Sequence, residues 1–127
     1  MNNVVRKHKF DMGHRLLNYQ GACRHAHGHE YHIEIFCEYS ATNDLGLGID
    51  FADIKKRLCT WLDDNLDHGF ACNPSDESML SLLKSEGNKV FITKLGNPSA
   101  ENISKEIFFV QVLRGVEGSQ VVPELLP

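Results

Sequence analysis

Between residues 27 and 39 the sequence alternates between two kinds of side chain, and this pattern constrains the fold more than any other feature. One set is aromatic, apolar or histidine, and the other is mainly acidic. The first set is His27, His29, Tyr31, Ile33, Ile35 and Cys37, and the second is Glu30, His32, Glu34 and Glu38. Successive side chains of a β-strand point to opposite faces, so the pattern predicts a strand with one buried and one polar face.

A second alternating segment covers residues 5 to 14. One side carries His8, Phe10, Met12 and His14, and the other carries Lys7, Lys9 and Asp11. This pattern predicts another strand, joined to the strand over 27–39 by a loop from about residue 15 to 26.

Helical spacing and turn residues predict the remaining elements. A helix should begin after Asp50, a good N-cap residue, because apolar side chains recur at helical intervals from there. We further expect a short helix over 76–85, a short strand over 90–92, a helix from Ala100 to about Leu113 capped by Ser99, and a last strand over 120–122. Pro123 suggests an edge position for that strand. The order predicts an α+β domain with helices packed on one face of an antiparallel sheet.

Composition narrows the class of protein. A chain of 127 residues has the size of one domain, here 1–127. With 13 basic and 17 acidic residues the net charge is -4, so we expect no nucleic-acid partner and no anionic membrane partner. No signal peptide or apolar run of ~18 residues is evident, which predicts a soluble cytoplasmic protein. The four cysteines form no C-x-x-C pair and are expected to be reduced.

Histidines suggest a metal site. His27 and His29 must point the same way if they lie two residues apart on a strand, and an antiparallel partner ending at His14 would add a third imidazole. Three neutral imidazoles with an open fourth position are typical of catalytic zinc. The alternative is a pair of ordinary polar strand residues facing solvent. Cys23, four residues before His27, and the Asp-His pair at 67–68 favour the metal.

Five motifs occur in order along the chain. They are Phe10-x-x-x-His14-Arg15-Leu16, Cys23-x-x-x-His27-Gly28-His29-x-Tyr31, Ile49-Asp50-Phe51 followed by Ile54-Lys55, Leu66-Asp67-His68, and Asn97-Pro98-Ser99-Ala100-Glu101-Asn102. Together they resemble the 6-pyruvoyltetrahydropterin synthase / 6-carboxytetrahydropterin synthase family from about residue 6 to 113. The resemblance implies a tunnelling-fold subunit, Zn2+ as cofactor, and a substrate of the 7,8-dihydroneopterin triphosphate type.

The resemblance also implies roles for single residues. Cys23 is expected to act as general base, because a nearby divalent cation and the flanking Arg24 and His25 would favour its thiolate. The alternative for Cys23 is a small buried hydrophobe. Asp67 would fix the tautomer of His68 while that ring moves a proton.

Glu101 is expected in the first turn of the last helix, where the resemblance implies that its carboxylate anchors the guanidine-like edge of a pterin. An ordinary first-turn glutamate is the alternative. Arg15, Arg24 or lysines of another subunit are candidates for contacting the triphosphate, and Glu124 is a candidate for the family's C-terminal glutamate.

The short spacing between Cys23 and His27 resembles the bacterial 6-carboxytetrahydropterin synthases. It therefore implies formation of 6-carboxy-5,6,7,8-tetrahydropterin, a step towards 7-deazaguanine nucleosides such as queuosine. Two alternatives remain: a triphosphate elimination of the 6-pyruvoyltetrahydropterin synthase type, and a non-catalytic zinc-binding or pterin-binding protein. The resemblance also implies a trimer-based homo-oligomer, such as a hexamer.

Overall fold

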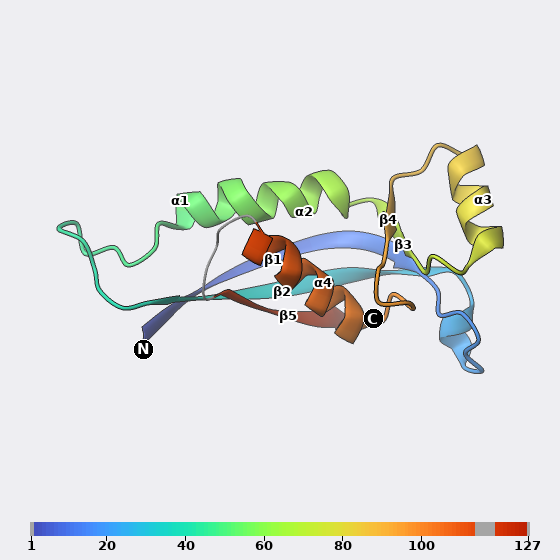
Figure 1. The fold of residues 1–127 in the computed structure, drawn as a ribbon, viewed down its shortest axis with the longest axis horizontal. Coiled ribbons are helices and arrows are strands. Elements are labelled where there is room, and N and C mark those ends of the chain that lie inside the picture. The colour runs from blue at the N-terminus through green and yellow to red at the C-terminus, as the bar shows by residue number, and fades with distance from the viewer. Residues whose placement is uncertain (1, 114–118, 127) are drawn as a thin grey trace.

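Two long strands form the centre of the computed structural model, which describes residues 2–113 and 119–126, with side chains up to residue 109. Strand β1 (Asn2–His14) and strand β2 (His27–Tyr39) pair antiparallel over their whole length, as Figure 1 shows. The strands predicted from alternation are confirmed. A short 3-10 turn, η1 (Ala22–Arg24), lies in the loop that joins them.

The sheet has five strands in the order β4-β3-β1-β2-β5. Strand β5 (Ser119–Leu126) pairs antiparallel with β2 and lies at the edge that Pro123 suggested. Strands β3 (Gly69–Cys72) and β4 (Val90–Ile92) run parallel, β3 to β1 and β4 to β3. The prediction of an antiparallel sheet therefore holds for three strands, whereas the complete sheet is mixed.

The path of the chain explains the parallel strands. The helix after β2 carries the chain back along β1, so β3 starts in the same direction as β1 (Figure 1). Helix α3 (Glu77–Ser85) then forms the crossover that a parallel β3–β4 pair needs.

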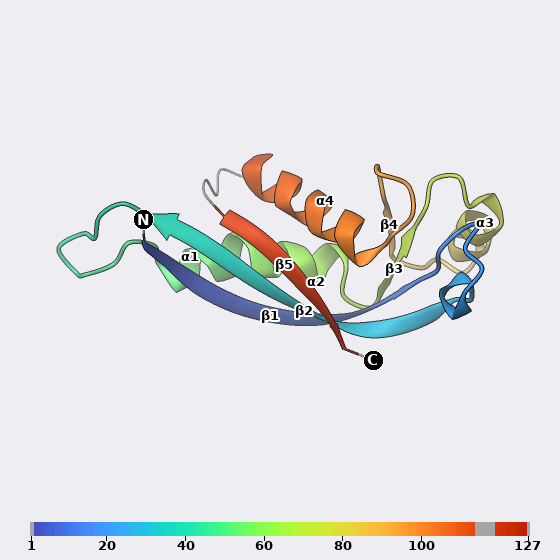
Figure 2. The same ribbon diagram turned by 90° about the horizontal axis from the view of Figure 1, so that it is seen from below.

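Helices cover one face of the sheet (Figures 1 and 2). The first is continuous through α1 (Phe51–Ile54), a wide π-helical turn η2 (Lys55–Cys59) and α2 (Thr60–Asn65). The Asp50 carboxylate accepts a hydrogen bond of 2.9 Å from the Ala52 amide, which confirms the predicted N-cap. The other is α4 (Ala100–Leu113). Within the described residues no helix is both long and apolar enough to cross a membrane.

The hydrophobic core lies between these helices and the sheet. Its buried members from the sheet are Phe10, Met12, Tyr31, Ile33, Ile35, Cys37 and Ala71, and those from or beside the helices are Ile54, Leu58, Cys59, Leu62, Leu66, Ile103 and Ile107. The inward positions of the alternating strands account for most of the first group. Burial of their apolar surface holds the helices on this face.

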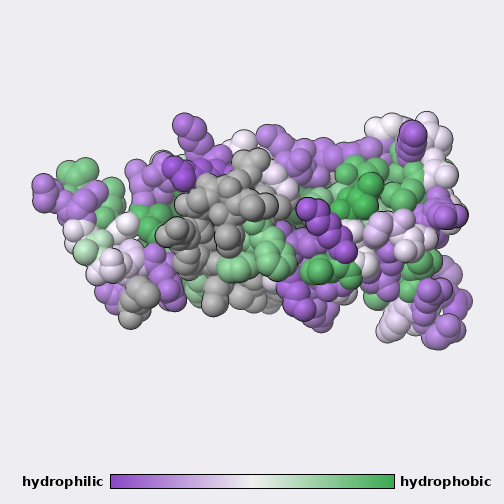
Figure 3. Space-filling view, in the orientation of Figure 1, coloured by the Kyte–Doolittle hydropathy of each residue, from purple (hydrophilic) through white to green (hydrophobic). Residues whose placement is uncertain are grey.

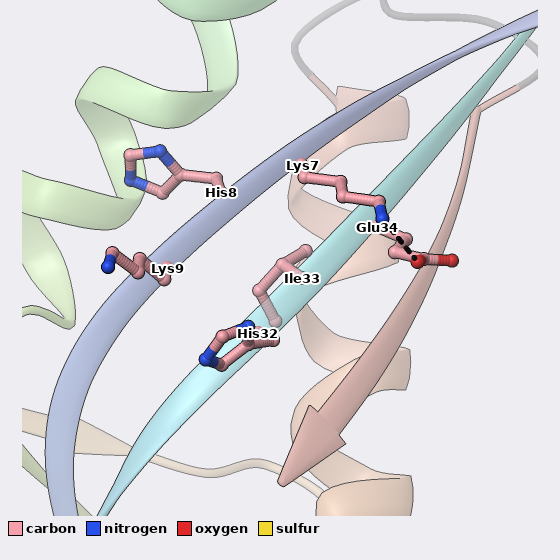
Figure 4. A pocket seen from close by; sticks show the side chains of 6 residues that line it. All are labelled: Lys7, His8, Lys9, His32, Ile33 and Glu34. Atoms are coloured by element: carbon pink, nitrogen blue, oxygen red, sulfur yellow. Dashed lines mark ion pairs between the residues drawn. The ribbon is translucent and has the colours of Figure 1, made fainter. Parts of the chain in front are cut away.

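The opposite face of the sheet carries mainly charged and polar side chains. Lys7, Lys9, His32 and Glu34 line a hollow there (Figure 4), with Lys7 Nζ 3.7 Å from Glu34 Oε1. His8 points away from this face toward the helix, where its Nε2 lies 2.7 Å from Asp63 Oδ1. None of the candidate catalytic residues lines this hollow.

Candidate metal centre

Three imidazoles converge at the end of the helix-covered face of β1 and β2. His14 and His27 are direct cross-strand partners, and His29 pairs with the residue two positions before His14. The ring centroids are separated by 4.6 Å (His14–His27), 5.1 Å (His14–His29) and 4.8 Å (His27–His29). One ring nitrogen of each lies within 4.8 Å of the others, so the trio can hold a metal ion. Strand pairing thus brings together the three histidines that the sequence predicted as metal ligands.

Hydrogen bonds from the main chain fix two of these rings. His14 Nδ1 donates to the Pro98 carbonyl at 2.7 Å, and His27 Nδ1 donates to the His25 carbonyl at 2.6 Å. A carbonyl only accepts, so each Nδ1 carries its proton and each neutral ring presents Nε2 as a lone pair.

The two Nε2 atoms of His14 and His27 lie 3.0 Å apart. Two lone pairs at that distance repel unless a cation or a proton lies between them. Burial, reinforced by the neighbouring His27 and His29, lowers the pKa of His14 and disfavours the proton. The donor set therefore fits a divalent cation bound by imidazole, with main-chain carbonyls orienting two ligands.

Cys23 lies in the turn η1 and is partly exposed, with a free thiol. The Leu16 amide donates to the Cys23 carbonyl at 2.8 Å, which folds the loop back toward the end of β1. The neighbouring Arg24 guanidinium donates to the His25 ring at 3.3 Å. The role of Cys23 as a base stays a prediction.

Asp67 and His68 form the predicted pair, because His68 Nδ1 lies 2.9 Å from Asp67 Oδ2. The Asp11 amide donates to Asp67 Oδ1 at 2.9 Å, and the His68 amide donates to the Asp11 carbonyl at 2.7 Å. Partial burial tends to raise the pKa of Asp67, but these contacts from Asp11 and His68 outweigh it and lower the pKa.

The imidazole of His68 lies open to solvent, with its side chain 77% exposed. The residue has a φ of 59°, a left-handed conformation that is uncommon outside glycine. His68 and His29 line the same open hollow, together with Glu30 and the paired glycines Gly13 and Gly28. One residue of the Asp67–His68 pair and one of the three clustered histidines therefore border the same hollow.

Glu101 lies in the first turn of α4, as predicted, and it is exposed. Ser99 Oγ accepts a hydrogen bond of 3.2 Å from the Asn102 amide, which confirms the predicted cap. Among the described side chains none forms a hydrogen bond or ion pair with the Glu101 carboxylate. The role of Glu101 as an anchor stays a prediction.

Arg15 differs from the sequence-based expectation. Its guanidinium binds the Asp76 carboxylate twice, at 2.6 Å from Nε and 2.5 Å from Nη2, and it also donates to Ser78 at 2.9 Å. Arg15 thus joins the end of β1 to the start of α3 and offers little free charge to a triphosphate. For Glu124 the structure gives only the main-chain register, opposite His32, because its side chain lies outside the described residues.

Sequence reasoning missed the main-chain carbonyls of His25 and Pro98. The pattern of side chains in a sequence does not predict which main-chain carbonyl will accept a hydrogen bond from a histidine. The Asn97-Pro98 pair gave the available signal, since it immediately precedes the capped helix.

The fold and the site define an α+β subunit with an open three-histidine centre at one end of its sheet. The family model described as 6-pyruvoyl tetrahydropterin synthase matches residues 3–117, and the chain belongs to this family. It is 37% identical over 105 residues to the 6-carboxy-5,6,7,8-tetrahydropterin synthase of Rickettsia bellii, covering 82% of this chain and 75% of that protein.

Solved structures confirm the tunnelling fold. An uncharacterized protein from Wolinella succinogenes, WS1659, superposes with a TM-score of 0.78 at 18% identity, covering 98% of this chain and 92% of that one. The 6-pyruvoyl tetrahydropterin synthase of Plasmodium vivax has a TM-score of 0.67 at 14% identity, with 98% of each chain covered. At these identities the likeness shows the fold alone.

Proposed function

We propose that this chain is a zinc-dependent lyase that converts 7,8-dihydroneopterin triphosphate to 6-carboxy-5,6,7,8-tetrahydropterin. The observation that carries the proposal is the pair of Nε2 lone pairs of His14 and His27, 3.0 Å apart with His29 beside them. The name of the Rickettsia bellii relative supports this product over others. We propose that the reaction takes place in the cytoplasm and is a step towards 7-deazaguanine nucleosides such as queuosine.

His14, His27 and His29 would hold the zinc ion. Three neutral imidazoles with room for a further ligand suit catalytic zinc better than ions that prefer oxygen ligands. When bound, the ion supplies a Lewis acid that polarises the hydroxyl groups of the substrate side chain and makes the attached C–H more acidic.

Proton transfers fall to Cys23 and to the Asp67–His68 pair. Cys23 acts as the base that takes a proton from a side-chain carbon. The Asp67 carboxylate, 2.9 Å from Nδ1, keeps His68 in the tautomer that presents Nε2, and the exposed ring returns or removes a proton at a side-chain oxygen.

Glu101 is the proposed anchor for the pterin ring. An exposed carboxylate at the start of α4 can accept two parallel hydrogen bonds from the N–H groups of a guanidine-like edge. The N-terminal end of the helix stabilises its negative charge.

We propose that the sites are completed between copies in a trimer-based homo-oligomer such as a hexamer. Cys23 and His68 make no direct contact with each other within the described chain, and both are accessible. Apolar side chains lie exposed in the loop before α1, where Leu45 is 83% exposed, and around β4, where Ile92 is 52% exposed (Figure 3). Such side chains fit an interface with further copies. Light scattering of the purified protein measures the assembly.

Product analysis tests the function. The zinc-loaded protein is mixed with 7,8-dihydroneopterin triphosphate, and the products are separated and identified. The proposal expects acetaldehyde, triphosphate and a carboxypterin. A pyruvoyl product would instead support the activity after which the family model is described, and no turnover would support a non-catalytic zinc-binding or pterin-binding protein.

A further inference from the structure

Asn97 connects two loops through its side-chain amide. Its Oδ1 accepts a hydrogen bond of 2.8 Å from the Leu17 amide, and its Nδ2 donates to the Leu17 carbonyl at 3.0 Å. These two bonds replace the pairing that a neighbouring strand would provide. Oδ1 also accepts from Asn73 Nδ2 at 3.0 Å, which ties in the loop after β3.

The residue after Asn97 touches the metal centre. The carbonyl of Pro98 is the acceptor that fixes Nδ1 of His14, and Pro98 is fully buried. His14 and Leu17 belong to one short stretch of chain, three residues apart. Two contacts therefore close a small loop of interactions: Asn97 holds the main chain at Leu17, and Pro98 holds the ring of His14.

The same segment leads into the helix that carries the proposed anchor. Asn102 Nδ2 donates to the Asn97 carbonyl at 2.9 Å and to the Leu95 carbonyl at 3.3 Å. The turn before α4 is thereby fixed by hydrogen bonds to Leu17 on one side and to Asn102 on the other. The position of Glu101 relative to His14 depends on this turn.

We propose that Asn97 is a positioning residue for the metal centre, whose clamp on Leu17 keeps the Pro98 carbonyl on Nδ1 of His14. The inference rests on the proposed function, because it assumes that His14 binds a metal. Groups that hydrogen-bond to the ligands of a metal ion typically contribute about 10–100-fold to the affinity for the metal. Since Asn97 acts one step further out, we expect its loss to weaken zinc binding about tenfold, the lower end of that range.

The test uses Asn97→Ala and Asn97→Asp in the full chain. The alanine variant removes all three side-chain bonds, whereas aspartate keeps the acceptor for the Leu17 amide and loses the donor to its carbonyl. Asn43→Ala is the matched control, because Asn43 Oδ1 also accepts two hydrogen bonds that hold a loop, from the Leu45 and Leu47 amides, and this loop lies outside the histidine cluster. Zinc affinity is measured by competition with a chromophoric chelator, and cobalt substitution reports the ligand geometry through its visible spectrum.

Nitrogen NMR of the metal-free protein gives a second measurement. It reads the tautomer of His14, which should be the Nδ1–H form in the wild type and a mixture in the Asn97 variants. We expect zinc affinity and tautomer to change with Asn97 and to stay constant in the Asn43 control. If Asn97→Ala does not fold, Asn97→Asp decides.

Two outcomes overturn the inference in different ways. Wild-type zinc affinity, cobalt spectrum and His14 tautomer in the Asn97→Asp protein would overturn the positioning role alone. A wild-type protein that binds no zinc would overturn the proposed function, and the inference with it.

Discussion

Replacing Asp76 by asparagine tests whether the Arg15–Asp76 pair is structural. Asp76 is 3% exposed, and Arg15 is 25% exposed. Breaking a buried ion pair from one side costs about 3–5 kcal/mol. Arg15 regains some hydration at its exposed part and asparagine still caps α3, so we expect a loss of about 2–3 kcal/mol. In a chain of this size that corresponds to a fall of roughly 8–12 °C in Tm.

Urea unfolding and thermal melting measure this loss, with Glu34→Gln as the control. Glu34 pairs with Lys7 at 3.7 Å, but the Lys7 side chain is 80% exposed. Exposed pairs contribute about 0–1 kcal/mol, so the control should change little. A loss in Asp76→Asn no greater than in Glu34→Gln would refute the structural role of the pair.

The pH dependence provides a further check on Asp76. The Arg15 guanidinium is the main cause that lowers the pKa of Asp76 below its ordinary value of 3.8. A carboxyl group whose pKa is depressed by folding stabilises the protein above its unfolded pKa and loses this contribution as the pH falls through its folded pKa. The stability difference between wild type and Asp76→Asn should therefore be constant near neutral pH and shrink only below about pH 4.

Three further changes have defined outcomes. Cys23→Ala should abolish turnover while zinc remains bound, as measured by product formation and elemental analysis. His27→Ala should lose the metal, because it removes a ligand; stoichiometric zinc in that variant would contradict the ligand assignment. Contact with Cys59, with Asp63 adding to it, raises the pKa of His8 above 6.5 despite burial. Stability from His8 is then fully present below pH 6.5 and lost as the pH rises through its folded pKa, so urea midpoints of Asp63→Asn should decline less over that range.

Strong local patterns predicted most of the fold. Alternation over 27–39 and 5–14 identified the two long strands, and the caps at Asp50 and Ser99 marked the starts of two helices correctly. Strand β3 (Gly69–Cys72) was missed, because only Phe70 among its four residues has a strong strand preference, whereas the predicted β4 consists of β-branched and aromatic residues. Its parallel pairing depends on contacts with residues far away in the sequence, which a local pattern does not contain.

The site shows the same division. His27 and His29 share a face by strand geometry alone, whereas His14 joins them only through the register that places it opposite His27. From the sequence Arg15 was a candidate for contacting the triphosphate, but the fold places the buried carboxylate of Asp76, at the start of α3, against it.

By itself the sequence determined the two amphipathic strands, the helix starts and the shared face of His27 and His29, because these follow from side-chain chemistry and short-range spacing. Only the tertiary structure decided the strand order, the partner of Arg15 and the carbonyl that orients His14. Those features are contacts between segments far apart in the sequence, and His14 and Pro98, for example, are separated by 84 residues. Such contacts arise when the whole core packs, so no single segment specifies them.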